Sequence, residues 1–216
     1  MKHISLILLL TLLAISCTEA PVEQVVYDGS QREAIIHNIL TRRSIRKYKD
    51  TQVSKAQLDT IMKSALFAPS ALNKQPWEVR VIQNKELLTE INDRFLSYAE
   101  GKEFQGSAAR YREPGFSIFH GAPTLIVIAR DTSSNISYLD CGIILQNILL
   151  SAHAIDLGTC PLGTLVPVLN KEENKDIIDL LNIPEGYEVA INVALGYPDE
   201  QPVAPKRYPE RLKIIE

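Results

Sequence analysis

The chain has 216 residues, 45% of them hydrophobic and 23% charged, with a formal net charge of −3 and no internal repeat or long low-complexity run. This length suits one domain with ample material for a core. A mildly acidic protein lacks the excess of lysine and arginine on which sequence-independent nucleic-acid binding depends, so no nucleic acid is expected as a partner.

The N-terminus has the pattern of an export signal. Lys2 is followed by an almost unbroken apolar run from Ile4 to Ala14, which is too short and wrongly flanked for a membrane-spanning helix. The run ends in A-I-S-C, and a small residue directly before Cys17 looks like a bacterial lipoprotein signal. We therefore expect residues 1–16 to be a signal peptide and Cys17 to carry lipid.

One position departs from that pattern. Leucine is usual three places before the cysteine, whereas Leu13 lies four places before it, so a plain cleaved signal with a chance cysteine is the alternative. Residues 17–30 are polar and are predicted to be a lipidated tether, and residues 31–216 would form the folded domain. The expected location is the bacterial cell envelope, with the protein anchored in a membrane through its N-terminal lipid.

The apolar pattern predicts secondary structure along the rest of the chain. The predicted helices cover residues 31–41, 54–67, 85–98, 138–156 and 171–181, and the predicted strands cover 78–82, 123–129 and 187–195. The spacing of Ser54 and Gln57 is that of a capping box. The helix at 138–156 is apolar around most of its circumference, which predicts burial on nearly all sides, within one subunit or between two, and Gly158 is expected to end it.

Two further segments are predicted to serve other surfaces. Residues 100–120 form a long polar stretch, and loops of this length tend to be lids or partner-binding segments. Residues 202–216 have too little core material to pack alone and should lie on another surface.

The cysteines and histidines show no ligand spacing. Cys141 and Cys160 are expected to be small buried side chains, and no metal site is expected. His37, His120 and His153 are interpreted as ordinary helix or loop residues, with His153 a core histidine whose hydrogen bonds are satisfied.

Two stretches in the first third of the chain suit an anionic ligand that also carries a polar ring. The first, R-R-S-I-R-K-Y at 42–48, crowds three guanidinium groups around a serine, which is costly unless an anion lies among them. Arginine forks match the oxygens of phosphate. The second, A-P-S-A-L-N-K-Q-P-W at 68–77, offers the amides of Asn73 and Gln75, and amides supply both donors and acceptors, as the edge of a flavin requires. Alone, each stretch reads as a basic turn or a proline-rich loop.

Together, and in this order, the two stretches resemble the nitroreductase family of FMN-dependent flavoproteins. Blocks at 140–153, 157–163, 194–198 and 205–209 resemble the family's later blocks, so the likeness covers residues 31–216. The resemblance implies an α+β fold with a central, mainly antiparallel sheet flanked by helices. It also implies a homodimer that exchanges its C-terminal arms and binds FMN at the subunit interface.

The same resemblance implies a set of cofactor-binding residues. Those implied at the phosphate and ribityl end are Arg42, Arg43, Ser44, Lys206 and Arg207. Those implied at the ring or its ribityl chain are Arg46, Pro69, Ser70, Asn73, Gln75, Leu162 and Gly163, of which the 69–75 group would come from the other subunit. Many relatives have an acidic residue where this chain has Leu162. Because Lys206 and Arg207 are adjacent, which of them meets the phosphate is open. Arg42 and Arg207 are both expected at the surface of the flavin-free protein.

The implied function is an FMN-dependent oxidoreductase that moves two electrons, by ping-pong hydride transfer, from NAD(P)H to a small acceptor such as a nitroaromatic or a quinone. No catalytic side chain is implied, since the flavin carries the chemistry. A membrane-anchored flavin-binding or electron-relay protein without turnover is the alternative. Export would remove the protein from cytoplasmic NAD(P)H, so a membrane quinol or another reductase is the alternative donor.

Overall fold

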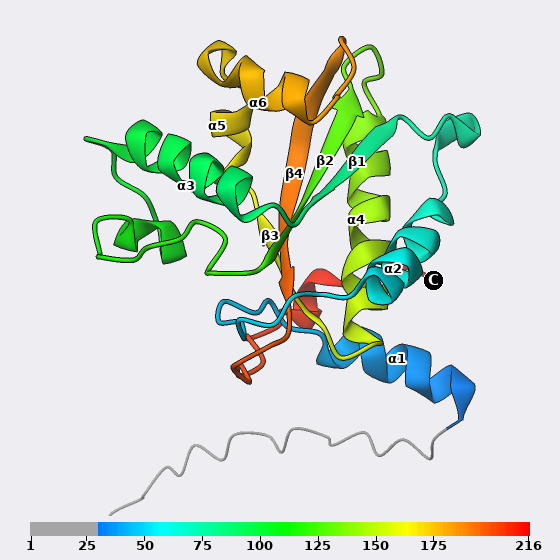
Figure 1. Cartoon of the computed structure of the whole chain (residues 1–216). Coiled ribbons are helices and arrows are strands. Elements are labelled where there is room, and N and C mark those ends of the chain that lie inside the picture. Colours follow the sequence, from blue (N-terminus) through cyan, green and yellow to red (C-terminus); the bar gives the residue numbers. More distant parts are fainter. Residues whose placement is uncertain (1–29) are drawn as a thin grey trace, which may run out of the picture.

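The computed structural model describes residues 30–216, in which a four-stranded sheet lies between two layers of helices (Figure 1). The strands are β1 (Trp77–Ile82), β2 (Thr124–Asp131), β3 (Gly158–Leu162) and β4 (Tyr187–Gly196), in the order β1-β2-β4-β3. All three neighbouring pairs are antiparallel. The sheet therefore has β1 and β3 as its edges, and the predicted antiparallel α+β architecture is confirmed.

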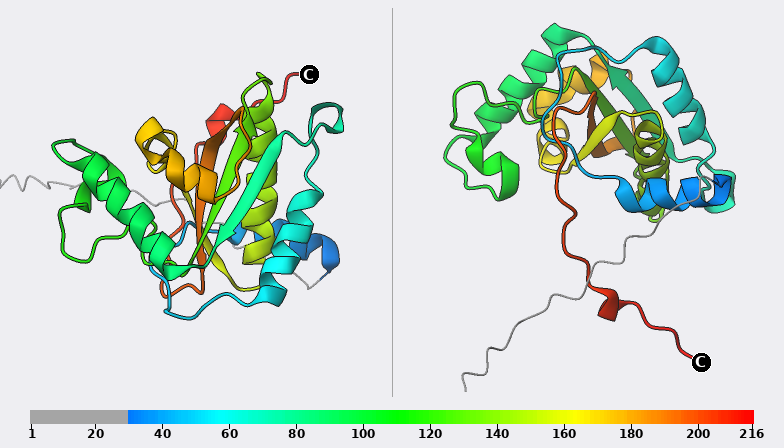
Figure 2. Two further views of the ribbon diagram at one scale, coloured as in Figure 1. Left: turned by 45° about the horizontal axis from the view of Figure 1, so that its top comes forward. Right: turned by 90° about the horizontal axis from the view of Figure 1, so that it is seen from below.

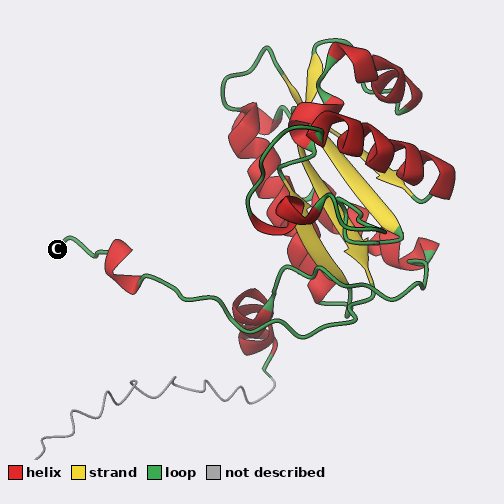
Figure 3. Cartoon of the chain, turned by 90° about the vertical axis from the view of Figure 1, so that its left-hand side faces the viewer, coloured by secondary structure: helices red, strands yellow, loops and turns green. Residues whose placement is uncertain are grey.

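The helices divide between the two faces of this sheet. They are α1 (Gln31–Thr41), α2 (Lys55–Leu66), α3 (Lys85–Ala99), α4 (Ser137–His153), α5 (Val166–Leu169) and α6 (Lys175–Leu180). One core cluster joins α2 and α4 to the sheet, and the other joins α3, α5 and α6 to its opposite face (Figures 1 and 3). Helix α1 lies against the C-terminal end of α4, where Asn38 Nδ2 donates to the carbonyl of Leu150 at 3.0 Å.

The alternation of side chains along β2 shows why this strand is apolar throughout. Leu125 and Val127 belong to the α3 side of the core, whereas Ile126 and Ile128 belong to the α4 side. Because successive side chains point to opposite faces, a strand covered on both faces needs apolar residues at every position. The capping box is also present, with Ser54 and Gln57 each accepting the other's backbone N–H.

The predicted helix at 138–156 is α4, which is shorter than expected. It ends at His153, and the turn that follows reverses at Asp156 with a φ of 62°. Gly158 is thus the first residue of β3, not a helix stop. The sequence did not predict β3 because its five residues G-T-C-P-L contain Gly158 and Pro161, which sheets tolerate at edges.

The prediction that α4 is buried on nearly all sides is wrong for one subunit. Ile144, Ile148 and Ala152 are buried, but Tyr138 and Leu139 are 52% and 61% exposed. Ile143, Leu145 and Leu150 on the same helix are only half-buried within residues 30–216. That a second subunit covers them stays a prediction.

The segment at 100–120 is packed on the subunit. It contains a short 3-10 helix, Gly106–Arg110, and an aromatic cluster attaches it to α3. The ring centroid of Phe95 in α3 lies 5.7 Å from that of Phe104 and 5.9 Å from that of Phe116. The rings of Phe104 and Tyr111 meet edge-on, with their centroids 5.8 Å apart. The predicted helix at 171–181 is a 3-10 turn, Glu172–Asn174, followed by α6.

The C-terminal residues leave the body of the subunit as an extended arm (Figures 2 and 3). Val203, Leu212 and Ile214 are each at least 85% exposed. This agrees with an arm that needs another surface, while arm exchange in a dimer stays a prediction. No helix within residues 30–216 has the length and apolar character needed to cross a membrane. The predicted signal peptide, Cys17 and nearly all of the tether lie outside the described residues.

Candidate functional site

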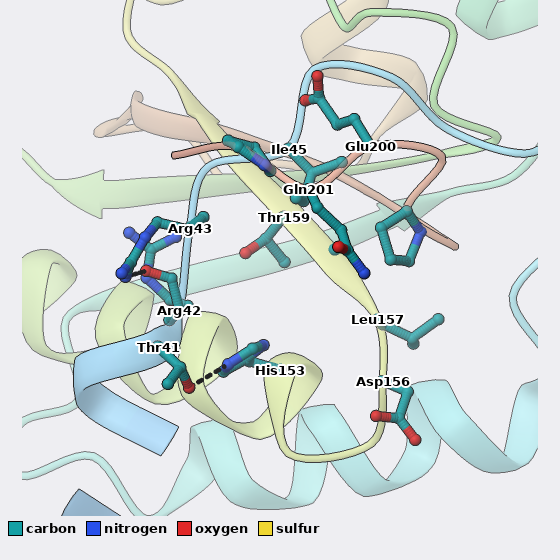
Figure 4. Close-up of a pocket in the computed structure, with 13 residues that line it drawn as sticks. Thr41, Arg42, Arg43, Ile45, His153, Asp156, Leu157, Thr159, Glu200 and Gln201 are labelled. Carbon is teal, nitrogen blue, oxygen red and sulfur yellow. Dashed lines mark hydrogen bonds between the residues drawn. The ribbon is translucent and has the colours of Figure 1, made fainter. Parts of the chain in front are cut away.

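A cavity of about 350 Å³ opens where the end of α1, the start of β3 and the segment after β4 meet (Figure 4). Its walls come from Thr41, Arg42, Arg43, Ile45, His153, Asp156, Leu157, Gly158, Thr159, Pro198, Glu200, Gln201 and Pro202. The two arginines lie on one side, Glu200 on another, and Thr159 lies on the strand between them (Figure 4). The cavity therefore has cationic and polar walls from segments far apart in the sequence.

Arg42 is half-buried in this cavity. Its backbone N–H caps α1 by donating to Asn38, and its Nη1 is buried without a hydrogen-bond partner among the described residues. Burial lowers the pKa of Arg42, and the charges of Arg43 and Arg207 lower it further. Arg42 is thus less exposed than expected, because α1 ends against the start of β3, and Arg207 is exposed as expected. An unpaired buried donor costs free energy and is ready for an anion.

Thr159 adds a second unpaired polar atom. Its Oγ1 is buried without a partner in the described chain. The backbone N–H of Ile45 donates to the carbonyl of Thr159 at 2.9 Å, and Ser44 forms a parallel bridge with Thr159. The basic segment is therefore held beside edge strand β3, which brings the Thr159 hydroxyl to the arginine wall of the cavity.

The three arginines of the basic segment do not converge on one point. Arg43 Nη1 donates to the carbonyls of Leu40 at 2.7 Å and Arg42 at 2.8 Å, so it is engaged at the C-terminus of α1. Arg46 lies beyond the buried Ile45 and lines a different cavity. The three guanidinium groups are therefore not crowded around Ser44 as predicted. Only Arg42 offers an unpaired nitrogen to the first cavity, and Arg43 lies beside it.

Two wall residues were not predicted from the sequence. His153 Nε2 lies 3.0 Å from Thr41 Oγ1, and burial together with the charge of Arg42 lowers its pKa. Glu200 accepts a hydrogen bond from the backbone N–H of Arg46. Neither position belongs to a motif with phosphate-binding character. The packing of α1 on the end of α4 brings His153 to Arg42, and the hydrogen bond from the Arg46 N–H holds Glu200. The prediction of a core histidine at 153 is wrong, because His153 is half-buried and lines the cavity, although its Nε2 has the partner that was expected.

The amide loop lies elsewhere in the subunit. It follows α2 and contains the 3-10 turn Ala71–Asn73, with positive φ at Asn73 (52°) and Gln75 (48°). The Gln75 N–H donates to Ser70 Oγ at 2.9 Å, and Gln75 Nε2 donates to Asn73 Oδ1 at 3.2 Å. Positive φ is uncommon outside glycine and marks a conformation that its surroundings enforce. Pro69, Asn73 and Gln75 are exposed, so the loop presents its amides outward.

The amide loop and the arginines lie at opposite ends of α4. The N–H of Ala71 donates to Asp140 Oδ1 at 3.1 Å in the first turn of α4, whereas Thr41 meets His153 in the last turn. With a rise of 1.5 Å per residue, these anchor points are about 20 Å apart along the axis. The structure thus does not bring the two predicted groups into one site within a subunit (Figure 1).

The remaining predicted residues lie on β3 and on the arm. Leu162 is buried at the end of β3 opposite Asn192, and Gly163 follows it. Arg207 is exposed, and its charge is close enough to lower the pKa of Arg42. Lys206 Nζ instead lies 5.4 Å from the ring centroid of Tyr208. Of the two arm cations, Arg207 is therefore the one that acts on Arg42.

Comparisons with known proteins agree with this fold. The sequence model described as the Nitroreductase family matches residues 39–197. The crystal structure of a nitroreductase with bound FMN from Desulfitobacterium hafniense is 31% identical, with a TM-score of 0.78 over 85% of this chain and 98% of that chain. An FMN-dependent nitroreductase from Clostridium difficile is also 31% identical, with a TM-score of 0.73 over 86% and 100%. An FMN reductase [NAD(P)H] of Bacillus subtilis is 26% identical over 82% of this chain and 70% of its own length.

Proposed function

The chain belongs to the nitroreductase family, and on this premise we propose that it is an FMN-dependent oxidoreductase of the NAD(P)H type. The observation that carries the proposal is the pair of unpaired buried polar atoms, Arg42 Nη1 and Thr159 Oγ1, at one cavity. A buried guanidinium nitrogen without a partner calls for an anion, and a hydroxyl beside it can donate to a second oxygen.

The residues present fit the phosphate end of FMN. Arg42 would hold the phosphate, with Ser44 and Thr159 beside it and Arg207 closing from the arm. Arg43 would contribute its positive charge but no hydrogen bond from Nη1, because that nitrogen already donates to two backbone carbonyls. Leu162 ends the same strand and Gly163 follows it, where the ring would lie, and Arg46 would stand at its pyrimidine edge.

We further propose a homodimer in which the amide loop of one subunit completes the site of the other. Two observations support it. The rise of α4 places the anchor of the amide loop about 20 Å from the anchor of Arg42. Within one subunit, the arginines are therefore too far from the loop residues Pro69, Ser70, Asn73 and Gln75 to share a site with them. In addition, α1, α4 and the arm expose apolar side chains that a symmetric partner would bury.

When bound, FMN supplies two-electron hydride chemistry, and the protein supplies position and charge. We propose a ping-pong sequence, in which the donor leaves as NAD(P)+ before the acceptor enters. A quinone would leave as the hydroquinone after gaining two electrons and two protons, and a nitro group as the nitroso group and water. No side chain is proposed to act as a catalytic acid or base. The Arg46 charge would favour an anionic reduced ring.

The cellular location remains a separate proposal. Export and lipidation at Cys17 are supported by the sequence pattern of residues 1–17 alone. Fractionation of cells that express the full chain, with Cys17→Ser as the comparison, tests it. A wild-type protein found in the soluble cytoplasmic fraction with Met1 intact would overturn export.

The function is tested on the purified protein by its absorbance spectrum. We expect flavin bands that bleach when NADH or NADPH is added without oxygen, and that return when a soluble quinone or nitroaromatic is added. Initial rates over both substrates should give parallel double-reciprocal lines. A protein that purifies without flavin and binds none when FMN is added would contradict the proposal. A flavin that is reduced but never reoxidised by small acceptors would instead support the electron-relay alternative.

A further inference from the structure

His153 lines the first cavity beside Arg42, and the proposed function gives it no role. It is the last residue of α4, and its half-buried ring lies against the end of α1 (Figure 4). Helix α1 is fixed there, because Asn38 Nδ2 donates to the carbonyl of Leu150, three residues earlier in α4. An imidazole next to an arginine that is ready for an anion can add a second positive charge to the same cavity.

The hydrogen bonds of Thr41 determine which ring nitrogen of His153 carries a proton. Thr41 Oγ1 donates its one proton to the carbonyl of His37 at 2.7 Å. Toward His153 Nε2, at 3.0 Å, the same oxygen therefore accepts, so Nε2 is the protonated nitrogen of the neutral ring. A further proton must go to Nδ1. Protonation of His153 thus keeps the bond to Thr41 and adds a charge to a ring that is already held in place.

The surroundings of His153 disfavour this further proton while the cavity holds no anion. Burial lowers the pKa of His153, and the charge of Arg42 lowers it further. Asp156, in the turn after α4, opposes this, whereas His37 and Arg43 on the α1 side add to it. The imidazole is therefore neutral at pH 7. The repulsion comes mainly from Arg42, the residue that is proposed to hold the phosphate.

A phosphate at Arg42 would change this balance. It carries about −1.5 to −2 charges at pH 7, which offset the guanidinium beside His153 and favour a proton on Nδ1. The cavity has few other cations to offer. Arg43 Nη1 already donates to two backbone carbonyls, Arg207 is exposed on the arm, and Glu200 adds a negative charge to another wall. His153 is thus the group that can supply positive charge when the phosphate is present.

We propose that His153 is a proton-linked residue of the phosphate site, whose Nδ1 takes up a proton from solvent when the phosphate of FMN binds. The contribution of His153 to FMN affinity then grows as pH falls, and it is absent for riboflavin, which has no phosphate. This inference rests on the proposed function, since it names how the same cavity is regulated. His153 acts on the selection of phosphorylated flavin and takes no part in hydride transfer.

The test is calorimetric titration of the flavin-free protein with FMN near pH 6, in buffers of different ionisation enthalpy, which counts the protons taken up on binding. We expect the wild type to take up about 0.3–0.5 proton more than His153→Gln, as a group does when binding raises its proton affinity about ten-fold. Glutamine keeps an N–H for Thr41 Oγ1 and does not titrate. The comparison cancels the protons that the phosphate itself releases.

The affinity should show the same linkage. At about pH 8 the Kd for FMN should agree within about two-fold between the two proteins, whereas at about pH 5.5 His153→Gln should bind FMN about five-fold more weakly. Riboflavin should not distinguish them at either pH. His37→Gln is the matched control, because it removes a neighbouring ring but keeps the backbone carbonyl that holds Thr41, so it should retain the extra proton.

Three results would overturn the inference: equal proton uptake by the wild type and His153→Gln, an extra proton that is lost in His37→Gln instead, or an equal weakening of riboflavin and FMN in His153→Gln. The last result would mean that His153 supports the fold or the ring site. Failure of the proposed function looks different, because FMN would then bind to neither protein, or would bind to both and stay oxidised when NAD(P)H is added.

Discussion

Replacement of Arg42 by methionine tests the phosphate end of the site. The substitution keeps a long flexible side chain but removes the charge and the unpaired Nη1. We expect opposite effects on two quantities: the affinity for FMN should fall, and the stability of the flavin-free protein should stay the same or rise. A residue that merely supports the fold would lower both.

The magnitudes follow from the surroundings of Arg42. One charge-assisted hydrogen bond to phosphate contributes about 1.5–3 kcal/mol, which corresponds to about a ten- to hundred-fold change in Kd. With Arg207→Ala added, the loss should reach about two to four powers of ten, because the arm cation contributes a second contact of the same kind. Without flavin, removing a buried unpaired donor should gain about 1 kcal/mol, or about 2–4 °C in melting temperature for a domain of this size.

The assay combines FMN titration by fluorescence quenching with thermal unfolding of the flavin-free protein. The Kd for FMN should change less between low and high salt in Arg42→Met than in the wild type, since salt screens the attraction between the arginine and the phosphate. Arg32→Met, on the exposed side of α1, is the matched control and should change neither quantity. If Arg42→Met binds FMN within two-fold of the wild type, the assignment of this cavity to the phosphate is wrong.

Three other predictions concern the loop, the arm and the histidines. Asp140→Ala leaves the N–H of Ala71 unpaired and should cost about 1–3 kcal/mol of unfolding free energy, measured in urea, whereas Asp140→Asn keeps the acceptor and should recover most of it. Deletion of residues 202–216 should release FMN and the dimer together, and light scattering that finds a flavin-loaded monomer would contradict this. Burial lowers the pKa of His120 and His153, so below about pH 6.5 the unfolded chain binds more protons than the folded one, and stability should fall as pH drops. The double variant His120→Asn, His153→Asn should therefore show a weaker dependence of the unfolding free energy on pH between about 7.5 and 5.5, as measured in urea.

The elements that the sequence predicted are those whose stabilising contacts are local or periodic. The helix from Lys55 to Leu66 has a capping box, and the strand from Thr124 to Asp131 has unbroken apolar character because both of its faces are covered. The strand from Gly158 to Leu162 has neither signal. Its conformation comes from pairing with β4 on one side and from the bridge between Ser44 and Thr159 on the other, and both are long-range contacts.

The site residues also differ in whether a local motif or only a long-range contact identifies them. The family's motif pointed to Arg42, but nothing in the motif showed that α1 would end against β3 and bury one guanidinium nitrogen. Thr159 reaches the cavity through its bridge with Ser44, and Glu200 through its hydrogen bond with the Arg46 N–H, so no spacing in the sequence could indicate them. His153 becomes a candidate only once the hydrogen bonds of Thr41 show which of its ring nitrogens takes up a proton.

Gly158 connects the fold to the first cavity and to the cavity that Arg46 lines. A Cβ at this position would lie 2.7 Å from Ile45 Cγ1 and 3.0 Å from Ile45 Cβ, closer than real side chains approach. The absence of a side chain at 158 is thus what lets the segment from Arg42 to Arg46 lie against the start of β3. Since Ile45 lines the first cavity and Arg46 the other, displacing Ile45 moves one wall of each.

Gly158→Ala should therefore destabilise the protein by about 1–3 kcal/mol through overpacking and should also weaken FMN, although residue 158 offers the phosphate no side-chain donor. Ile45→Ala removes Cγ1, the atom nearest to the new Cβ, and keeps Ile45 Cβ at 3.0 Å, so adding it to Gly158→Ala should restore part of both losses. The check is a double-mutant cycle in urea unfolding and in FMN titration, in which residues in contact couple by about 0.5–3 kcal/mol. If the two substitutions are additive in both measurements, the close approach of Ile45 to Gly158 is not what positions the arginines.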